Sequence, residues 1–124
     1  SGVYINVCRT VGWPYSCIGG VLSGSTGDYL FPNLPPGTYY ASTWGAKAPY
    51  LDRLFAGLDC RQCDVTKGTP IVVVADATTP NIDFALATGG RMTGRVTDRA
   101  TGTGLASVVL VFTSSAQPNL VLYG

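Results

Sequence analysis

The sequence of 124 residues contains no histidine and no glutamate, so that all seven of its carboxylate side chains are aspartates. Histidine is the usual general base near neutral pH and the commonest metal ligand, and glutamate is a frequent carboxylate in catalytic sites. Without histidine, the serines also lack the base that serine hydrolase chemistry requires. We therefore expect a protein that is not an enzyme and that holds neither a metal ion nor a cofactor.

Charge is also scarce. Charged residues make up 12% of the chain, which is about half the typical share, and the net charge is +1. No basic run is present, so nucleic acid is not an expected partner. The longest apolar run, residues 71–75, is far shorter than the roughly 20 residues that a membrane span needs. The sequence has neither a starting methionine nor a signal peptide, which indicates a mature or excised segment.

Sixteen glycines and eight prolines separate short apolar runs, and no stretch keeps a helical period, which predicts an all-β fold. In residues 81–86, Ile82, Phe84 and Leu86 alternate with polar positions, as on a strand with one buried face. Residues 46–59 are the least β-like and allow one helical turn. Strands are predicted at residues 3–8, 18–22, 29–31, 38–44, 69–75, 81–86, 90–97 and 106–112.

Four cysteines allow three disulfide connectivities. Their closeness in sequence favours Cys8–Cys17 and Cys60–Cys63, and disulfides favour an oxidising, extracellular setting. A zinc site of four thiolates is one alternative, although the spacing of Cys8 and Cys17 does not make a zinc knuckle. A redox role for Cys60 and Cys63 is another, although that motif usually begins a helix after a strand.

The chain also carries an internal repeat. SGVYINV at residues 1–7 matches ASVVLVF at residues 106–112, position for position. The residues before 106 resemble a lead-in that residue 1 lacks. We therefore interpret residues 1–88 as one module without its first strand, and residues 89–124 as the first strands of the next repeat, acting as a connector or donor segment.

Two motifs, GRVTDRATGTGLASVVLVF and GDYLFPNLPPGTYY, resemble bacterial carboxypeptidase regulatory-like repeats, which are related to prealbumin-like and collagen-adhesin B-type modules. Gly104 and Ser107 depart from the proline and glycine of the family pattern. The resemblance implies an Ig-like, prealbumin-like antiparallel β-sandwich of Greek-key type, strung in tandem on secreted or surface proteins and without catalysis of its own. The matching residues are Gly94, Val96, Asp98, Thr101, Gly102, Leu105, Val108 and Leu110 in the first motif, and Gly27, Tyr29, Phe31, Leu34, Pro35, Gly37 and Tyr39 in the second.

The order of the strands departs from the family, because the module's first strand, GGRMTGRV, comes at residues 89–96. Residues 1–88 should then present an open edge or cleft. Residues 90–97 of the same chain could complete this sheet, as could the tail of a preceding repeat, or the C-terminal segment of one subunit could insert into the next. We favour donation between subunits, because residues 106–112 are apolar on both faces and require burial. The residues expected to mediate self-association are Met92, Val96, Val108, Val109, Leu110, Val111 and Phe112.

These features predict a structural subunit or repeat of a secreted bacterial surface filament or stalk, whose partners are identical subunits or neighbouring repeats. The alternative is a carbohydrate- or surface-binding accessory module that uses exposed aromatic side chains. Its candidate contacts are Trp13, Tyr15, Trp44 and Tyr50. Packing at the edge of the core, or against the next subunit, is the competing interpretation of these aromatics.

The arginines of the C-terminal segment are close together in sequence. Arg91 and Arg95 share the polar face of the strand predicted at residues 90–97, and Arg99 follows it. Such a stripe is usually a solvated face. It could also pair with aspartates across an interface.

Overall fold

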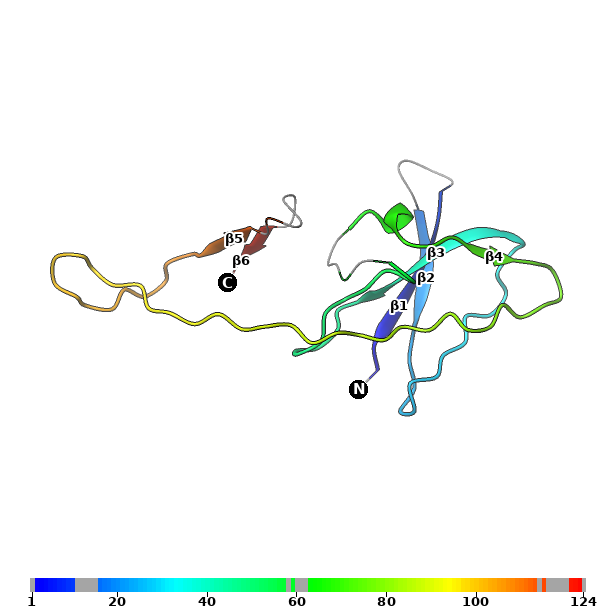
Figure 1. Cartoon of the computed structure of the whole chain (residues 1–124), viewed down its shortest axis with the longest axis horizontal. Coiled ribbons are helices and arrows are strands. Elements are labelled where there is room, and N and C mark those ends of the chain that lie inside the picture. Colours follow the sequence, from blue (N-terminus) through cyan, green and yellow to red (C-terminus); the bar gives the residue numbers. More distant parts are fainter. Residues whose placement is uncertain are drawn as a thin grey trace. The chain divides into compact units, whose positions relative to one another are not determined.

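The computed structural model describes residues 2–10, 16–57, 59, 63–113, 115 and 121–123, and the chain divides into two compact units, Ser1–Gly89 and Gly90–Gly124. The prediction of an all-β protein is confirmed, since the described residues contain strands and one short 3-10 helix but no α-helix (Figure 1). The first unit holds β1 (Tyr4–Arg9), β2 (Ser16–Leu22), β3 (Gly37–Trp44), η1 (Val65–Lys67) and β4 (Ile71–Val73). The second holds β5 (Val111–Thr113) and β6 (Val121–Tyr123).

The first unit is built on one antiparallel sheet of four strands in the order β2-β1-β3-β4. The strand predicted at residues 3–8 is confirmed as β1, and Ile5 and Val7 are buried on one face of the sheet. Cys8 follows on the opposite face by the same alternation, and it is buried too, against Leu54 and Val65. The sheet therefore buries side chains on both of its faces.

One face packs against a small core of Cys8, Leu54 and Val65, with Tyr40 and Cys63 against it. Leu54 belongs to a segment that runs along the edge of β3. The main-chain N–H of Phe55 donates a hydrogen bond of 2.9 Å to the carbonyl oxygen of Ala41. The main-chain N–H of Thr43 donates one of 2.9 Å to the carbonyl oxygen of Arg53. The helical turn expected within residues 46–59 is therefore wrong, because these main-chain groups bond to the sheet edge.

Several predicted strands are also wrong. Residues 29–31, 81–86 and 90–97 form no strand, and of residues 106–112 only the last two belong to one, β5. A strand needs a hydrogen-bonded neighbour, and periodicity alone does not supply one. In the first unit, the described residues give one four-stranded sheet faced by irregular segments. The sandwich and Greek-key arrangement thus remain part of the proposal below.

The second unit contains a tight turn and a hairpin. The Asp98 carboxylate accepts hydrogen bonds from the main-chain N–H groups of Ala100 at 2.7 Å and Thr101 at 3.0 Å, and these bonds lower the pKa of Asp98. Gly102 has a φ of 74°, a conformation that favours glycine. Beyond this turn, β5 pairs antiparallel with β6.

Candidate functional site: a cavity along the sheet

A cavity of about 930 Å³ lies along the other face of the four-stranded sheet. Its floor consists of buried side chains from three adjacent strands, β1, β3 and β4. Two irregular segments, residues 27–34 and 74–84, together with Leu86, form its walls. The floor residues are Ile5, Val7, Tyr39, Ala41, Thr43 and Ile71.

The two wall segments are joined through Tyr29. Its hydroxyl donates a hydrogen bond of 2.6 Å to the carbonyl oxygen of Ile82, and its ring lies 6.5 Å from that of Phe84. Phe84 also meets Phe55 edge to face at 6.1 Å. Burial, and secondarily the charge of Asp83, raise the pKa of Tyr29. These contacts hold the walls over the sheet.

Residues 81–86 have the side-chain pattern of a strand but none of its main-chain hydrogen bonds. Ile82, Phe84 and Leu86 are half-buried and line the cavity, while the residues between them are exposed, so the predicted alternation is confirmed. Within the described residues, no main-chain N–H of this segment donates a hydrogen bond. Pairing begins only beyond it, where the N–H of residue 51 donates to the carbonyl of residue 87 at 2.9 Å.

The predicted first strand, residues 90–97, is unpaired in the same way. Among the described residues, its main-chain N–H groups donate no hydrogen bond, and its first paired group is the carbonyl of Val96, which accepts from Leu105 at 2.9 Å. Met92 is 81% exposed, although the sequence places it on the apolar face. The described part of the chain thus contains two strand-like segments that pair with no described strand.

Of the other residues predicted for self-association, Val96 is half-buried, whereas the run from Val108 to Phe112 is exposed. The expected burial of both faces of residues 106–112 by a neighbouring subunit stays a prediction. Val111 and Phe112 lie in β5, whose strand neighbour among the described residues is β6.

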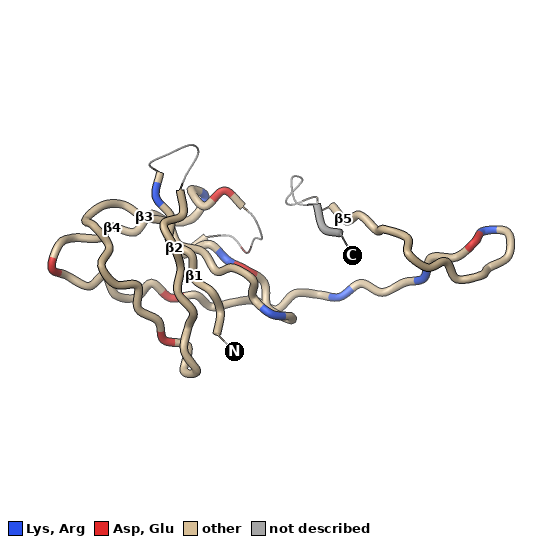
Figure 2. The backbone as a smooth tube through the Cα atoms, turned by 180° about the vertical axis from the view of Figure 1, so that it is seen from behind, with Lys and Arg blue, Asp and Glu red and all other residues tan. Residues whose placement is uncertain are grey.

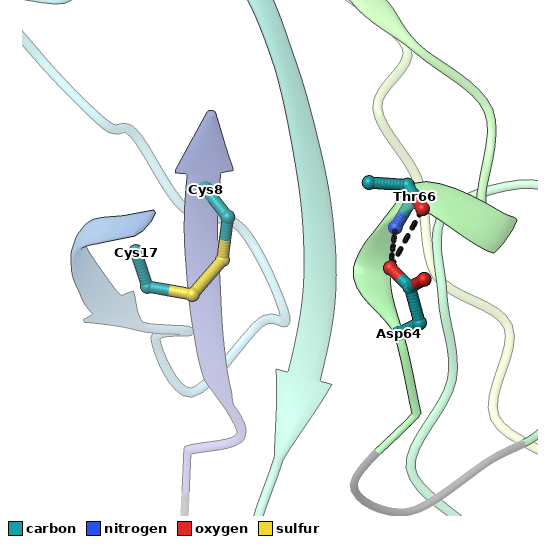
Figure 3. The surroundings of a disulfide bond; sticks show 4 residues. All are labelled: Cys8, Cys17, Asp64 and Thr66. Carbon is teal, nitrogen blue, oxygen red and sulfur yellow. Dashed lines mark hydrogen bonds between the residues drawn. A yellow bond between two sulfur atoms is a disulfide. The ribbon is translucent and has the colours of Figure 1, made fainter. Parts of the chain in front are cut away.

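The disulfide predicted between Cys8 and Cys17 is present, and it joins the paired strands β1 and β2 (Figure 3). It excludes the alternative of a zinc site with four thiolates. Cys63 is disulfide-bonded too, while its expected partner, Cys60, lies outside the described residues. Nearby, Asp64 caps η1 by accepting from the N–H of Thr66 at 2.9 Å and from its hydroxyl at 2.6 Å, which lowers the pKa of Asp64.

Two of the four candidate glycan contacts can be placed. Trp44 is 47% and Tyr50 51% exposed, whereas Trp13 and Tyr15 lie outside the described residues. Tyr4 is not among the aromatics predicted from the sequence, yet it is the cross-strand partner of Trp44 and is also exposed. Only the register of β1 against β3 reveals this pair.

A second residue missed in the sequence is Asp52, whose buried carboxylate organises the turn after β3. It accepts hydrogen bonds from the main-chain N–H groups of Gly45 at 3.0 Å and Ala46 at 2.9 Å, and from the hydroxyl of Thr43 at 3.3 Å. The same hydroxyl accepts from the N–H of Arg53 at 2.8 Å. These bonds fix the backbone beside Trp44.

Comparison of the chain with protein-family models, with curated proteins and with solved structures finds no match. The family resemblance therefore stays a prediction. In the described ranges, no helix has the length and apolar character to cross a bilayer, and no three potential metal ligands come together. The cavity along the sheet is the feature on which a functional argument can be built.

Proposed function

We propose that this chain is a structural repeat of a secreted filament or stalk, and that residues 90–97 of one copy enter the cavity of the next as an added strand. The observation that carries the proposal is the cavity itself, which combines a buried apolar floor with an adjacent segment, residues 81–86, whose main-chain N–H groups are unpaired in the described structure. An unpaired edge beside an apolar cavity is the usual receptor for an added β-strand. With the strand in place, a second layer would complete the sandwich.

Residues 90–97 match this receptor in pattern and in length. Met92 and Val96 are four positions apart, with Gly94 midway between them, so all three share one face of an extended strand. Eight extended residues reach about 26 Å, which exceeds the roughly 20 Å of residues 81–86. Residues 106–112 fit less well, because they match β1, and β1 already occupies its place between β2 and β3.

Donation from one copy to the next does not close on itself, so it leads to a linear assembly rather than a discrete oligomer. Each added strand would satisfy main-chain groups in both partners and cover apolar side chains. The Cys8–Cys17 disulfide supports an oxidising compartment, in keeping with an extracellular fibre.

The test is the mass of the full chain over a concentration series, by analytical ultracentrifugation, with negative-stain imaging of the concentrated sample. We expect masses that rise in multiples of the 12.9 kDa chain, and linear particles. The double substitution Met92→Ser, Val96→Ser should weaken the association, because it replaces the two large apolar side chains of this face by polar ones. Thr93→Ser, on the opposite face, is the matched control. A monomer at every concentration would refute the proposal.

One observation favours the alternative of a carbohydrate-binding module, namely the exposed cross-strand pair of Tyr4 and Trp44. Flat aromatic rings with a polar tip suit the faces of sugar rings. Binding to an array of glycans that Trp44→Ala abolishes, in a chain that stays monomeric, would support this function instead.

A further inference from the structure

We infer that Asp83 is the residue by which the cavity selects its strand, and that it does so by pairing with Arg91 and Arg95 of the donated segment. This inference rests on the proposed function and adds a chemical requirement to it. The occupant must be a strand with one apolar face and one basic face. A second copy of this chain supplies such a strand.

The charges that line the cavity are of one sign. Asp28, Asp76 and Asp83 are among its lining residues, and none of the described residues that line it is a lysine or an arginine. The segment after residue 89 has the opposite balance, since residues 90–99 contain three arginines, Arg91, Arg95 and Arg99, and one acid, Asp98. Figure 2 marks the acidic positions along the backbone in red and the basic positions in blue.

The two unpaired segments also present their charges on matching faces. In residues 81–86 half-buried side chains alternate with exposed ones, and Asp83 is the charged member of the exposed set. In residues 90–97 the two arginines alternate with Met92 and Val96. When the apolar faces of both segments point into the cavity, Asp83 and the arginines share the other face.

Neighbouring strands bring residues on the same face within reach, either directly opposite or two positions along. If Asp83 lies opposite Arg91 or Arg95, it forms a direct pair. If it lies opposite Thr93, it has one arginine on each diagonal. Every register that buries Met92 and Val96 beside residues 82–86 therefore gives Asp83 an arginine neighbour. Asp83 also acts electrostatically on the cavity wall, because its negative charge adds to the effect of burial in raising the pKa of Tyr29.

The experiment measures association of the full chain by analytical ultracentrifugation at low and high ionic strength. Asp83→Asn should weaken association about 1.5- to 5-fold, and Asp83→Arg about 2- to 30-fold, because repulsion then replaces attraction. Wild-type association should weaken as salt is added, and that of Asp83→Asn less so. Arg99→Asp, outside the donated strand, is the control and should change association less than 2-fold, on the order of a surface substitution.

Charge reversal gives the decisive comparison. The double variant Arg91→Asp, Arg95→Asp should associate as poorly as Asp83→Arg, while a mixture of the two should associate better than either alone. The triple variant should return to within about 2-fold of wild type, since a true pair shows such coupling. If none of these charge substitutions changes the strength of association, the role of Asp83 is refuted, while strand donation itself is not. Absence of association in the wild type would instead overturn the proposed function.

Discussion

The buried carboxylate of Asp52 provides a quantitative test of the first unit, because its substitution removes known bonds. Asp52→Ala deletes the acceptor for the main-chain N–H groups of Gly45 and Ala46. Hydrogen bonds to charged groups contribute about 1.5–3 kcal/mol each. Since Gly45 is exposed and water can replace part of its bond, the lower value applies. We expect Asp52→Ala to lower the free energy of unfolding by about 3 kcal/mol.

Asp52→Asn keeps one acceptor oxygen and should lower the free energy of unfolding by about half as much, about 1.5 kcal/mol. Asp28→Ala is the matched control, because Asp28 is exposed and its side chain accepts only from the hydroxyl of Thr26, at 2.7 Å, among the described residues. It should cost less than about 0.5 kcal/mol. The assay is equilibrium unfolding in urea, followed by circular dichroism and fluorescence. Equal effects of Asp52→Ala and Asp28→Ala would refute the structural role of Asp52.

Three further substitutions test other parts of the first unit by the same assay. Cys17→Ala removes the cross-link to Cys8 with little loss of packing and should cost about 2–3 kcal/mol from the loop it opens, so an unchanged stability under oxidising conditions would argue against the disulfide. Tyr29→Phe should cost about 1 kcal/mol for its lost hydrogen bond. Because folding raises the pKa of Tyr29 above 10.0, the wild type should lose stability as the pH rises past that value, and Tyr29→Phe should lose less; equal pH profiles would contradict this. Gly20→Ala should cost about 2 kcal/mol, since a Cβ there would lie 2.6 Å from a main-chain oxygen of β1, whereas Gly90→Ala meets nothing within 4 Å and serves as the control.

The sequence was sufficient where structure follows from neighbouring residues. The strand at residues 3–8 and the Cys8–Cys17 pairing each depend on spacings of a few residues, and both are present. The alternation that makes Ile82, Phe84 and Leu86 half-buried and the residues between them exposed likewise follows from the two-residue period of an extended chain.

The rest depended on contacts between distant residues. An alternating pattern makes residues 81–86 fit for a strand, but a ladder requires a second chain segment beside them, and periodicity does not identify it. The edge of β3 gives residues 53–55 an extended backbone against a local preference for a helical turn. Asp52 owes its role to the turn at residues 45–46, to which nothing in the sequence connects it.

Amide hydrogen exchange of the full chain tests the central claim most directly, because it measures protection of the main-chain groups at issue. In dilute solution we expect fast exchange in both residues 81–86 and residues 90–97, since the described structure gives their N–H groups no hydrogen-bond acceptor. In concentrated solution both segments should become protected together, while the amides of β1 and β3 stay protected throughout. Protection of both segments that does not change with concentration would show that a chain fills its own cavity. Fast exchange at every concentration would show that the cavity receives no strand.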